Sequence, residues 1–256
     1  MTNQHFKIIM TCRNAEKWIA RSVQSVLNQN YTNWQAVVVD ALSEDHTYKI
    51  LLNSLDQVDS EKFIIIANLE IETAIVNNFK AIQAVCPEDE DVLVFLDGDD
   101  WFYDSHTLEH LNEAYSDPDV WITWGNYILH PYRKHRGDLP IPANYELRKE
   151  RWITSHLKTC KYFLWRNIKN EDFRNTNTGK YYTTSRDVAF MFPMLEMAGP
   201  KHRKFIDKTL YVYNSVNPTS DRLIHNHERR ITVRDIRNRP PYAERTKEQL
   251  LLKGVG

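Results

Sequence analysis

Short, mainly apolar runs alternate with longer amphipathic stretches over the first 100 residues. Runs of this kind indicate buried strands, and they lie at residues 6–10, 34–39, 63–67 and 92–96. Between them, apolar side chains recur at helical spacing in residues 15–29, 43–55 and 72–85. Strict alternation of strand and helix is typical of a parallel sheet with helices on both faces. We therefore expect an α/β fold.

The alternation becomes irregular after residue 104. Helices are expected at residues 105–115, 154–168 and 186–197, the last ended by Gly199 and Pro200. Strands are expected at residues 120–128, 205–206 and 210–213, and polar or proline-rich loops at residues 131–142 and 171–180. We expect a mixed sheet in this half, followed by a charged, helical tail at residues 225–256.

The composition excludes several classes of protein. Basic and acidic residues number 33 and 34, so the net charge gives no reason to expect a nucleic-acid partner. Cys12, Cys86 and Cys160 are too scattered for a disulfide framework, which favours a reducing compartment, the cytoplasm. The N-terminus lacks the apolar segment of a signal peptide, and no apolar stretch approaches the ~20 residues of a membrane-spanning helix.

Three carboxylates follow the fourth strand directly. Asp97, Asp99 and Asp100 lie within four positions, separated only by Gly98. Carboxylates crowded in this way repel one another unless a cation lies among them, and such oxygen ligands suit Mg²⁺ or Mn²⁺. The alternative is an ordinary acidic turn in which Gly98 supplies a positive φ.

Other polar residues follow the first two strands. Thr11, Arg13 and Asn14 come after the first strand, and Asp40 ends the second. Open α/β sheets bind ligands beyond the carboxyl ends of their strands, so these residues and the acidic cluster are expected to converge on one crevice.

Several segments resemble family 2 glycosyltransferases of the GT-A fold. They are residues 8–14, 25–31, 37–40, 95–100, 185–187 and 194–199. The run Phe-Leu-Asp-Gly-Asp-Asp at residues 95–100 is similar to the DxD signature of that family, and Ser185-Arg186-Asp187 to the segment that holds its catalytic base. The order and spacing of the segments carry the resemblance.

The resemblance implies a Rossmann-like, nucleotide-sugar-binding sheet flanked by helices. Residues 1–224 would form the glycosyltransferase domain, with a nucleotide-sugar-binding half at residues 1–104 and an acceptor-binding half at residues 105–224. The residues implied to bind the nucleotide sugar are Thr11, Arg13, Asn14, Asp40, Asn78, Asp97 and Gly98. Asp99 would ligate Mn²⁺ or Mg²⁺, with Asp97 and Asp100 beside it, and Asp187 would be the general base.

The chain departs from the family pattern at three places. Ala41 and Leu42 follow Asp40 where a second acid and a glycine are common, Asn77 replaces an arginine, and Arg186 replaces the acid that usually precedes the catalytic aspartate. The nucleotide and sugar preferences of the family therefore do not transfer.

These residues fit an inverting, metal-dependent transfer of a sugar from a nucleoside-diphosphate sugar to an acceptor hydroxyl. The cation would neutralise the leaving diphosphate, and Asp187 would take the acceptor's proton. The alternative role for Asp187 is a helix N-terminal carboxylate favoured by the helix dipole. We expect a UDP-sugar ahead of a dTDP- or GDP-sugar, a glycan or glycoconjugate as acceptor, and no transmembrane segment.

Two rival functions remain. A nucleotidyltransferase would need a glycine-rich phosphate loop, and none follows the first strand. A non-catalytic nucleotide-sugar or carbohydrate-binding module could keep the fold without the activity.

Further aromatic, histidine and basic residues have two interpretations each. Tyr211, Tyr213 and Asn214 lie where the family often has a lid near the phosphates. Trp152, His156 and Trp165 could stack on an acceptor sugar, although we expect them in the core. His202, His225 and His227 could supply another ligand near the metal, although we expect them on the surface. The basic tail is expected to be a solvated face or an anchor on another protein.

Overall fold

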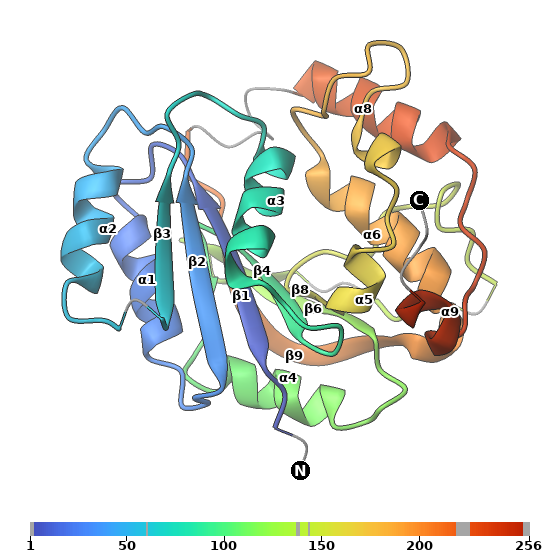
Figure 1. Cartoon of the computed structure of the whole chain (residues 1–256), viewed down its shortest axis with the longest axis horizontal. Coiled ribbons are helices and arrows are strands. Elements are labelled where there is room, and N and C mark those ends of the chain that lie inside the picture. Colours follow the sequence, from blue (N-terminus) through green and yellow to red (C-terminus); the bar gives the residue numbers. More distant parts are fainter. Residues whose placement is uncertain (1–2, 60, 137–138, 143, 219–225, 253–256) are drawn as a thin grey trace.

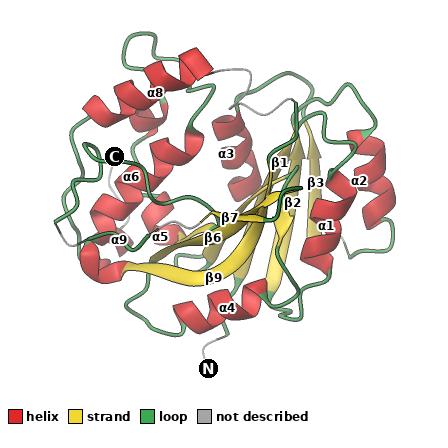
Figure 2. Cartoon of the chain, turned by 180° about the vertical axis from the view of Figure 1, so that it is seen from behind, coloured by secondary structure: helices red, strands yellow, loops and turns green. Residues whose placement is uncertain are grey.

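A mixed sheet of nine strands runs through the part of the chain that the structure describes (Figures 1 and 2). A computed structural model describes residues 3–59, 61–136, 139–142, 144–218 and 226–252. The parallel strands are β1 (Phe6–Cys12), β2 (Trp34–Asp40), β3 (Phe63–Ala67) and β4 (Val92–Asp97). Their order in space is β3-β2-β1-β4, so the earliest strand lies between later ones and all four end at one edge.

Helices cover both faces of this parallel half, as predicted. They are α1 (Ile19–Leu27), α2 (Thr47–Leu55), α3 (Ala74–Val85) and, after the acidic loop, α4 (Thr107–Tyr115). Successive side chains of a strand point to opposite faces. Ile8 of β1 therefore packs in the core beneath α1, α2 and α4, whereas Ile9 packs in the core beneath α3. The burial of β1, β2 and β4 explains their continuous apolar runs in the sequence, whereas the edge strand β3 is only partly buried.

The second half of the sheet is mixed. Its strands are β5 (Trp101–Phe102), β6 (Ile122–His130), β7 (Lys134–Arg136), β8 (Lys158–Lys161) and β9 (Arg203–Asn214). The order continues from β4 through β8, β6 and β9 to β5, with β7 paired to β6. β8 runs antiparallel to β4, and Lys158 is the partner of Phe95.

Residues 154–168 do not form the helix that their sequence predicted. We expected one helix there, but the segment forms β8 and only a short helix, α5 (Tyr162–Trp165). The open edge of β4 explains the difference, because its buried backbone groups need hydrogen-bond partners and β8 supplies them. The two short strands expected at residues 205–206 and 210–213 are one continuous strand, β9.

The remaining helices cover the face of the sheet that α3 shares. They are η1 (Asn170–Phe173), α6 (Arg186–Ala198), η2 (Pro200–His202), α8 (Asn226–Asn238) and α9 (Lys247–Leu251). α6 ends at Gly199, which has a φ of +62°, so the expected helix stop is confirmed. In the segment predicted as a tail, Ile236 of α8 and Leu250 of α9 are buried in the core with α6. Within the described ranges, no helix is both long enough and apolar enough to cross a membrane.

Candidate functional site

The acidic loop after β4 is pressed against the end of β1. Thr11 and Asp97 are partners in the sheet, and the Gly98 N–H donates to the Thr11 carbonyl oxygen at 3.0 Å. A Cβ atom on Gly98 would lie 2.4 Å from Cys12 Cβ. The suggestion that Gly98 supplies a positive φ is wrong, because the glycines with a positive φ in the described chain are Gly179 and Gly199. Gly98 is needed here for the close approach of two strands.

Asp97 is held by an arginine from a distant helix. Arg186, the first residue of α6, pairs through Nη2 with Asp97 Oδ1, and its Nη1 donates to Thr11 Oγ1 at 2.9 Å. The guanidinium thus joins α6 to the carboxyl ends of β1 and β4. Three residues that are far apart in sequence meet at this point.

The other two acids of the loop are tied to the end of β9 and the turn after it. Tyr211 Oη donates to Asp100 Oδ2 and the Asn214 N–H to Asp100 Oδ1, both at 2.6 Å. Asn217 Nδ2 donates to Asp99 Oδ2 at 2.7 Å. Burial, together with the charge of Asp97, raises the pKa of Asp99 to about 6. Burial and the neighbouring carboxylates also raise the pKa of Asp100 well above its usual range.

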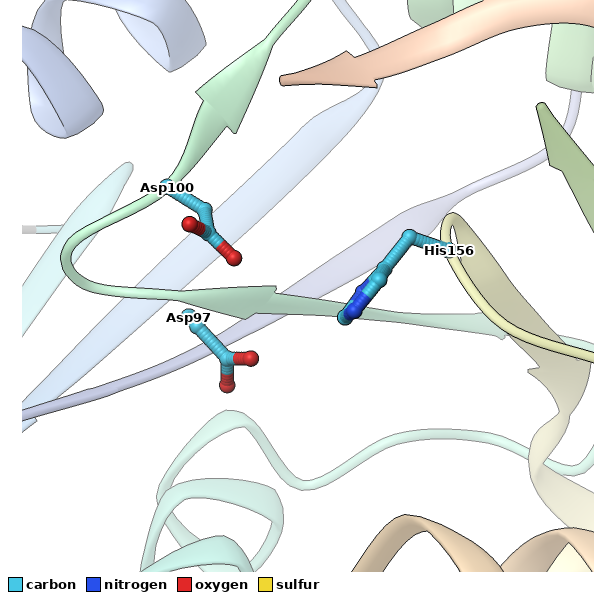
Figure 3. Close-up of side chains that lie close together, drawn as sticks. All are labelled: Asp97, Asp100 and His156. Carbon is cyan, nitrogen blue, oxygen red and sulfur yellow. The ribbon is translucent and has the colours of Figure 1, made fainter. Parts of the chain in front are cut away.

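His156 completes a group of metal-type ligands. Asp97, Asp100 and His156 each offer an atom, and these atoms lie within 4.8 Å of one another. Figure 3 shows the imidazole, from the bend before β8, directed toward the two carboxylates. Burial, and then Lys158 and Arg186, lower the pKa of His156 and keep it neutral, which is the form that binds metals. Two carboxylates and an imidazole fit a divalent cation.

The three ligand atoms are not the set that the sequence predicted. Asp97 and Asp100 were expected beside the metal, and both belong to the group. Asp99, the expected principal ligand, is not one of the three, and His156 was expected in the core. His156 is indeed buried and stacks on Tyr211 with ring centroids 4.4 Å apart. Its position beside Asp100 depends on β8, which the sequence analysis did not predict.

Asp187 lies in the first turn of α6, beside Arg186. Its Oδ1 accepts from the Val188 N–H at 3.0 Å, and Oδ2 lies 3.8 Å from the Nζ of Lys158. The side chain of Lys158 is only 6 % exposed, and its Nζ also lies 3.3 Å from His156 Nδ1. The Asp187 side chain is 36 % exposed, so it can meet a ligand from solvent. Asp187 therefore approaches the loop from an element separate from β4.

Asp40 ends β2 at the same edge and orders the neighbouring loop. It is 4 % exposed, and Ser43 Oγ donates to its Oδ1. The helix expected at residues 43–55 begins only at Thr47, because Ser43 bonds Asp40 and the Asn14 N–H. This local hydrogen bonding competes with the first turn of the expected helix.

Two of the other predicted nucleotide-sugar ligands, Asn14 and Arg13, bond to Glu44 in the loop after β2, whereas Asn78 is buried in α3. Asn14 turns back to the loop after β2, where its Oδ1 accepts from the Glu44 N–H. The Arg13 side chain is 39 % exposed and pairs with Glu44 at 3.1 Å. In α3, Asn78 is 2 % exposed, and its Nδ2 has no hydrogen-bond partner among the described residues. Its neighbour Asn77 accepts from Asn68 Nδ2 at 2.7 Å and has a structural role.

Sequence reasoning missed Lys158 and Asn217 as members of this site. Neither stands in a motif, and only the pairing of β8 with β4 and the turn after β9 bring them here. The sequence did mark Arg186 as unusual, because it replaces the acid that usually precedes the catalytic aspartate in the family. Tyr211 and Asn214 were expected near the phosphates, and they hold Asp100.

The remaining residues lie away from the loop. Trp165 is buried in the core as expected. His202 was expected on the surface, but its side chain is only 12 % exposed and stacks on Trp121 with ring centroids 3.5 Å apart. His227 is exposed, whereas His225 lies outside the described residues.

The chain resembles known proteins in both sequence and fold. The model of the family described as glycosyl transferase family 2 matches residues 7–173. No curated protein matches the sequence.

Solved structures share the fold at low sequence identity. TarS 1–349 of S. aureus in complex with UDP is 16 % identical with a TM-score of 0.63, and the match covers 84 % of this chain and 61 % of that one. The same protein in complex with UDP-GlcNAc is 14 % identical with a TM-score of 0.60, and the match covers 84 % of this chain and 59 % of that one. The mannosyltransferase PcManGT of Pyrobaculum calidifontis in complex with GDP-Man and Mn²⁺ is 15 % identical with a TM-score of 0.57. That match covers 82 % of this chain and 56 % of PcManGT. The chain thus spans about three fifths of these relatives' length.

Proposed function

Because the chain belongs to glycosyl transferase family 2 and is therefore a transferase with a GT-A fold, we propose that it moves a sugar from a nucleoside-diphosphate sugar to a hydroxyl group with inversion. The observation that carries the proposal is the meeting of four carboxylates at one edge of the sheet. Asp97, Asp99 and Asp100 come from the loop after β4, and Asp187 from α6, which is joined to that loop by Arg186. A family match alone would not exclude a non-catalytic relative.

The donor would lie beyond the carboxyl ends of β1, β2 and β4. Thr11, Asp40 and Asp97 line that edge, and Asn78 has a buried amide without a partner in the described chain. An unpaired buried amide costs about 1–3 kcal/mol, so a polar ligand would relieve it. Arg13 and Asn14, which face the Glu44 loop, would contact the base through the backbone.

The acids of the loop would hold Mn²⁺ or Mg²⁺. Asp97, Asp100 and His156 have the required closeness, and Asp99 lies next to them in the chain. When bound, such a cation neutralises charge on the leaving diphosphate. PcManGT with GDP-Man and Mn²⁺ supports this cofactor class.

Asp187 would act as the general base. Its carboxylate would take the proton of the acceptor hydroxyl while the acceptor oxygen bonds to the anomeric carbon and the bond to the diphosphate breaks. The electron pair of that bond leaves with the diphosphate, and a single displacement inverts the anomeric centre. Asp187 and the acidic loop lie on separate elements, as an in-line displacement requires.

The acceptor would be a glycan or glycoconjugate that binds the half formed by residues 105–224. We place donor binding in residues 1–104, and a UDP-sugar is the first donor to test, followed by GDP- and dTDP-sugars. TarS with UDP-GlcNAc and PcManGT with GDP-Man support these classes. The cytoplasm is the proposed compartment, supported by the three unpaired cysteines.

The test combines ligand binding with turnover. The melting temperature of the protein is measured with UDP-, GDP- and dTDP-sugars, each with Mn²⁺ and with EDTA. A ligand at about 100 times its dissociation constant adds about 2.7 kcal/mol of stability, which identifies the donor class. Release of the nucleoside diphosphate from that donor then separates an enzyme from a binding module. Absence of any nucleotide-sugar effect would contradict the proposal, and an equal effect in EDTA would contradict the metal.

A further inference from the structure

Arg186 lies where a donor diphosphate would be held. Its guanidinium bridges Thr11 Oγ1 at the end of β1 and Asp97 Oδ1 at the end of β4. The side chain is 24 % exposed, so part of it is open to solvent. The next residue is Asp187, which places this cation between the acidic loop and the proposed base.

The charge of Arg186 is the opposite of what the resembled pattern would place there. An acid at this position would add a carboxylate to Asp97, Asp99 and Asp100 and would repel a diphosphate. The arginine instead brings a permanent positive charge to the same place. Lys158 is the second cation of the site, but it is directed to Asp187 and His156. Arg186 is therefore the cation that contacts Thr11 and Asp97 at the donor edge.

We propose that Arg186 binds the diphosphate of the donor and of the product, a role that rests on the function proposed above. A guanidinium presents its N–H groups in a planar fork that matches phosphate oxygens as well as it matches a carboxylate. Arg186 keeps Asp97 paired when no nucleotide is present, and it exchanges this carboxylate for phosphate oxygens when the donor binds. Asp97 then becomes available to the cation.

A purely structural role makes a different prediction. If Arg186 only ties α6 to the sheet, its loss lowers the melting temperature and leaves nucleotide affinity unchanged. If Arg186 binds the diphosphate, its loss weakens the binding of nucleoside diphosphates much more than the binding of the matching monophosphates. The ratio of the two affinities is therefore the decisive quantity, since a general loss of packing affects both ligands alike.

The experiment is isothermal titration of UDP, UMP, GDP and GMP with Mn²⁺ present, on the wild-type chain and on Arg186→Ala and Arg186→Lys. From the strength of charged hydrogen bonds, we expect Arg186→Ala to weaken the affinity for the diphosphates about 10- to 100-fold and the affinity for the monophosphates far less. Arg186→Lys keeps the positive charge but loses the planar guanidinium. Its diphosphate affinity should therefore lie between those of the wild type and Arg186→Ala. Melting temperatures of all variants report on folding.

Arg166→Ala is the matched control. Arg166 pairs with Asp89 just before the amino end of β4, whereas Arg186 pairs with Asp97 at its carboxyl end. Its side chain is similarly exposed, at 17 %. The control should change the melting temperature without changing the diphosphate-to-monophosphate ratio.

Three outcomes decide the matter. A wild-type ratio in folded Arg186→Ala overturns the inference and leaves the proposed function intact. Should Arg186→Ala fail to fold, a wild-type ratio in Arg186→Lys overturns it. If the wild-type chain binds neither UDP nor GDP, the proposed function fails, and this inference fails with it.

Discussion

At the scale of single residues, the acidic loop contains carboxylates in different environments. Asp97 is paired with Arg186, and Asp100 accepts one hydrogen bond on each oxygen, from Tyr211 and from Asn214. Asp99 has one amide partner, Asn217, and lies close to the negative charge of Asp97. The three carboxylates therefore differ in how much their ionisation lowers the stability of the folded protein.

Asp99→Asn should stabilise the protein at neutral pH when metal and nucleotide are absent. Burial and Asp97 raise the pKa of Asp99 from 3.8 to about 6, so ionisation costs the folded state up to about 3 kcal/mol. The amide keeps an oxygen for Asn217 and carries no charge. The gain should be full at pH 7.5, decline as the pH falls through 6 because Asp99 takes up a proton, and vanish near pH 4. Thermal melts across this range measure it, and a pH-independent gain would contradict the explanation.

Asp187→Asn should separate chemistry from binding. The amide preserves the shape of the side chain but cannot accept the acceptor's proton. Removing a positioned general base typically lowers the rate by about 10²- to 10⁴-fold, and donor affinity should stay near normal. Turnover and donor affinity are measured on the same preparation.

Asp119→Asn is the control for this variant. Asp119 also pairs with a lysine, Lys201 at 3.1 Å, but precedes β6 and lies away from the acidic loop. Near-normal turnover in Asp187→Asn, or a product that retains the donor's anomeric configuration, would show that another residue or mechanism operates.

At the scale of elements, the site is made by strand ends that approach one another closely. The loop after β4 touches β1 at Gly98, and β8 brings His156 and Lys158 to the same edge. α6 then presents Arg186, which pairs with Asp97, and Asp187, which lies 3.8 Å from Lys158. The position of each catalytic candidate therefore depends on pairing between elements rather than on its own segment.

Gly98→Ala tests that dependence. The added Cβ would lie 2.4 Å from Cys12 Cβ and 3.0 Å from the Thr11 carbonyl oxygen, so the loop must move away from β1. Overpacking of this kind typically lowers the free energy of unfolding by about 1–3 kcal/mol. Because the loop carries Asp97 and Asp99, nucleotide binding should weaken as well. Denaturant unfolding and nucleotide titration measure the two effects, and an unchanged protein would mean that the approach is looser than described.

At the scale of the whole molecule, the C-terminal segment is built into the core. The Tyr242 N–H donates to Glu196 Oε2 of α6 at 2.9 Å, and Arg166 donates to the Leu250 carbonyl oxygen at 3.1 Å. Leu250 is fully buried against α5 and α6, and a capping box at Thr246 begins its helix. Residues 226–252 thus support α6, which carries the proposed base.

Leu250→Ala should destabilise the protein strongly for a single residue near the end of the chain. Removing a fully buried leucine side chain typically lowers the free energy of unfolding by about 2–5 kcal/mol. Leu252, two positions later, is 71 % exposed, so Leu252→Ala should change that value by less than about 0.5 kcal/mol. Denaturant unfolding of both variants measures the difference. Equal effects would mean that α9 does not contribute to the core.

The sequence by itself determined the parallel half of the sheet and its helices. Strands β1, β2 and β4 are almost wholly buried and the edge strand β3 is partly buried, so their sequences are apolar runs, and the helices between them keep their apolar periodicity. These are local signals. The sequence also located the acids of the candidate site, because a strand followed by Asp97, Asp99 and Asp100 must present them at the edge where parallel strands end.

Only the tertiary structure decided which partners those acids have. β8 was predicted as a helix, since a four-residue strand carries little pattern of its own and is fixed by the open edge of β4. Consequently the neighbours His156 and Lys158 could not be predicted, nor could the pairing of Asp97 with Arg186 across 89 positions. The physical reason is that periodicity is set by nearby residues, whereas a charge's partner is set by strand order and helix placement, which exist only in the folded chain.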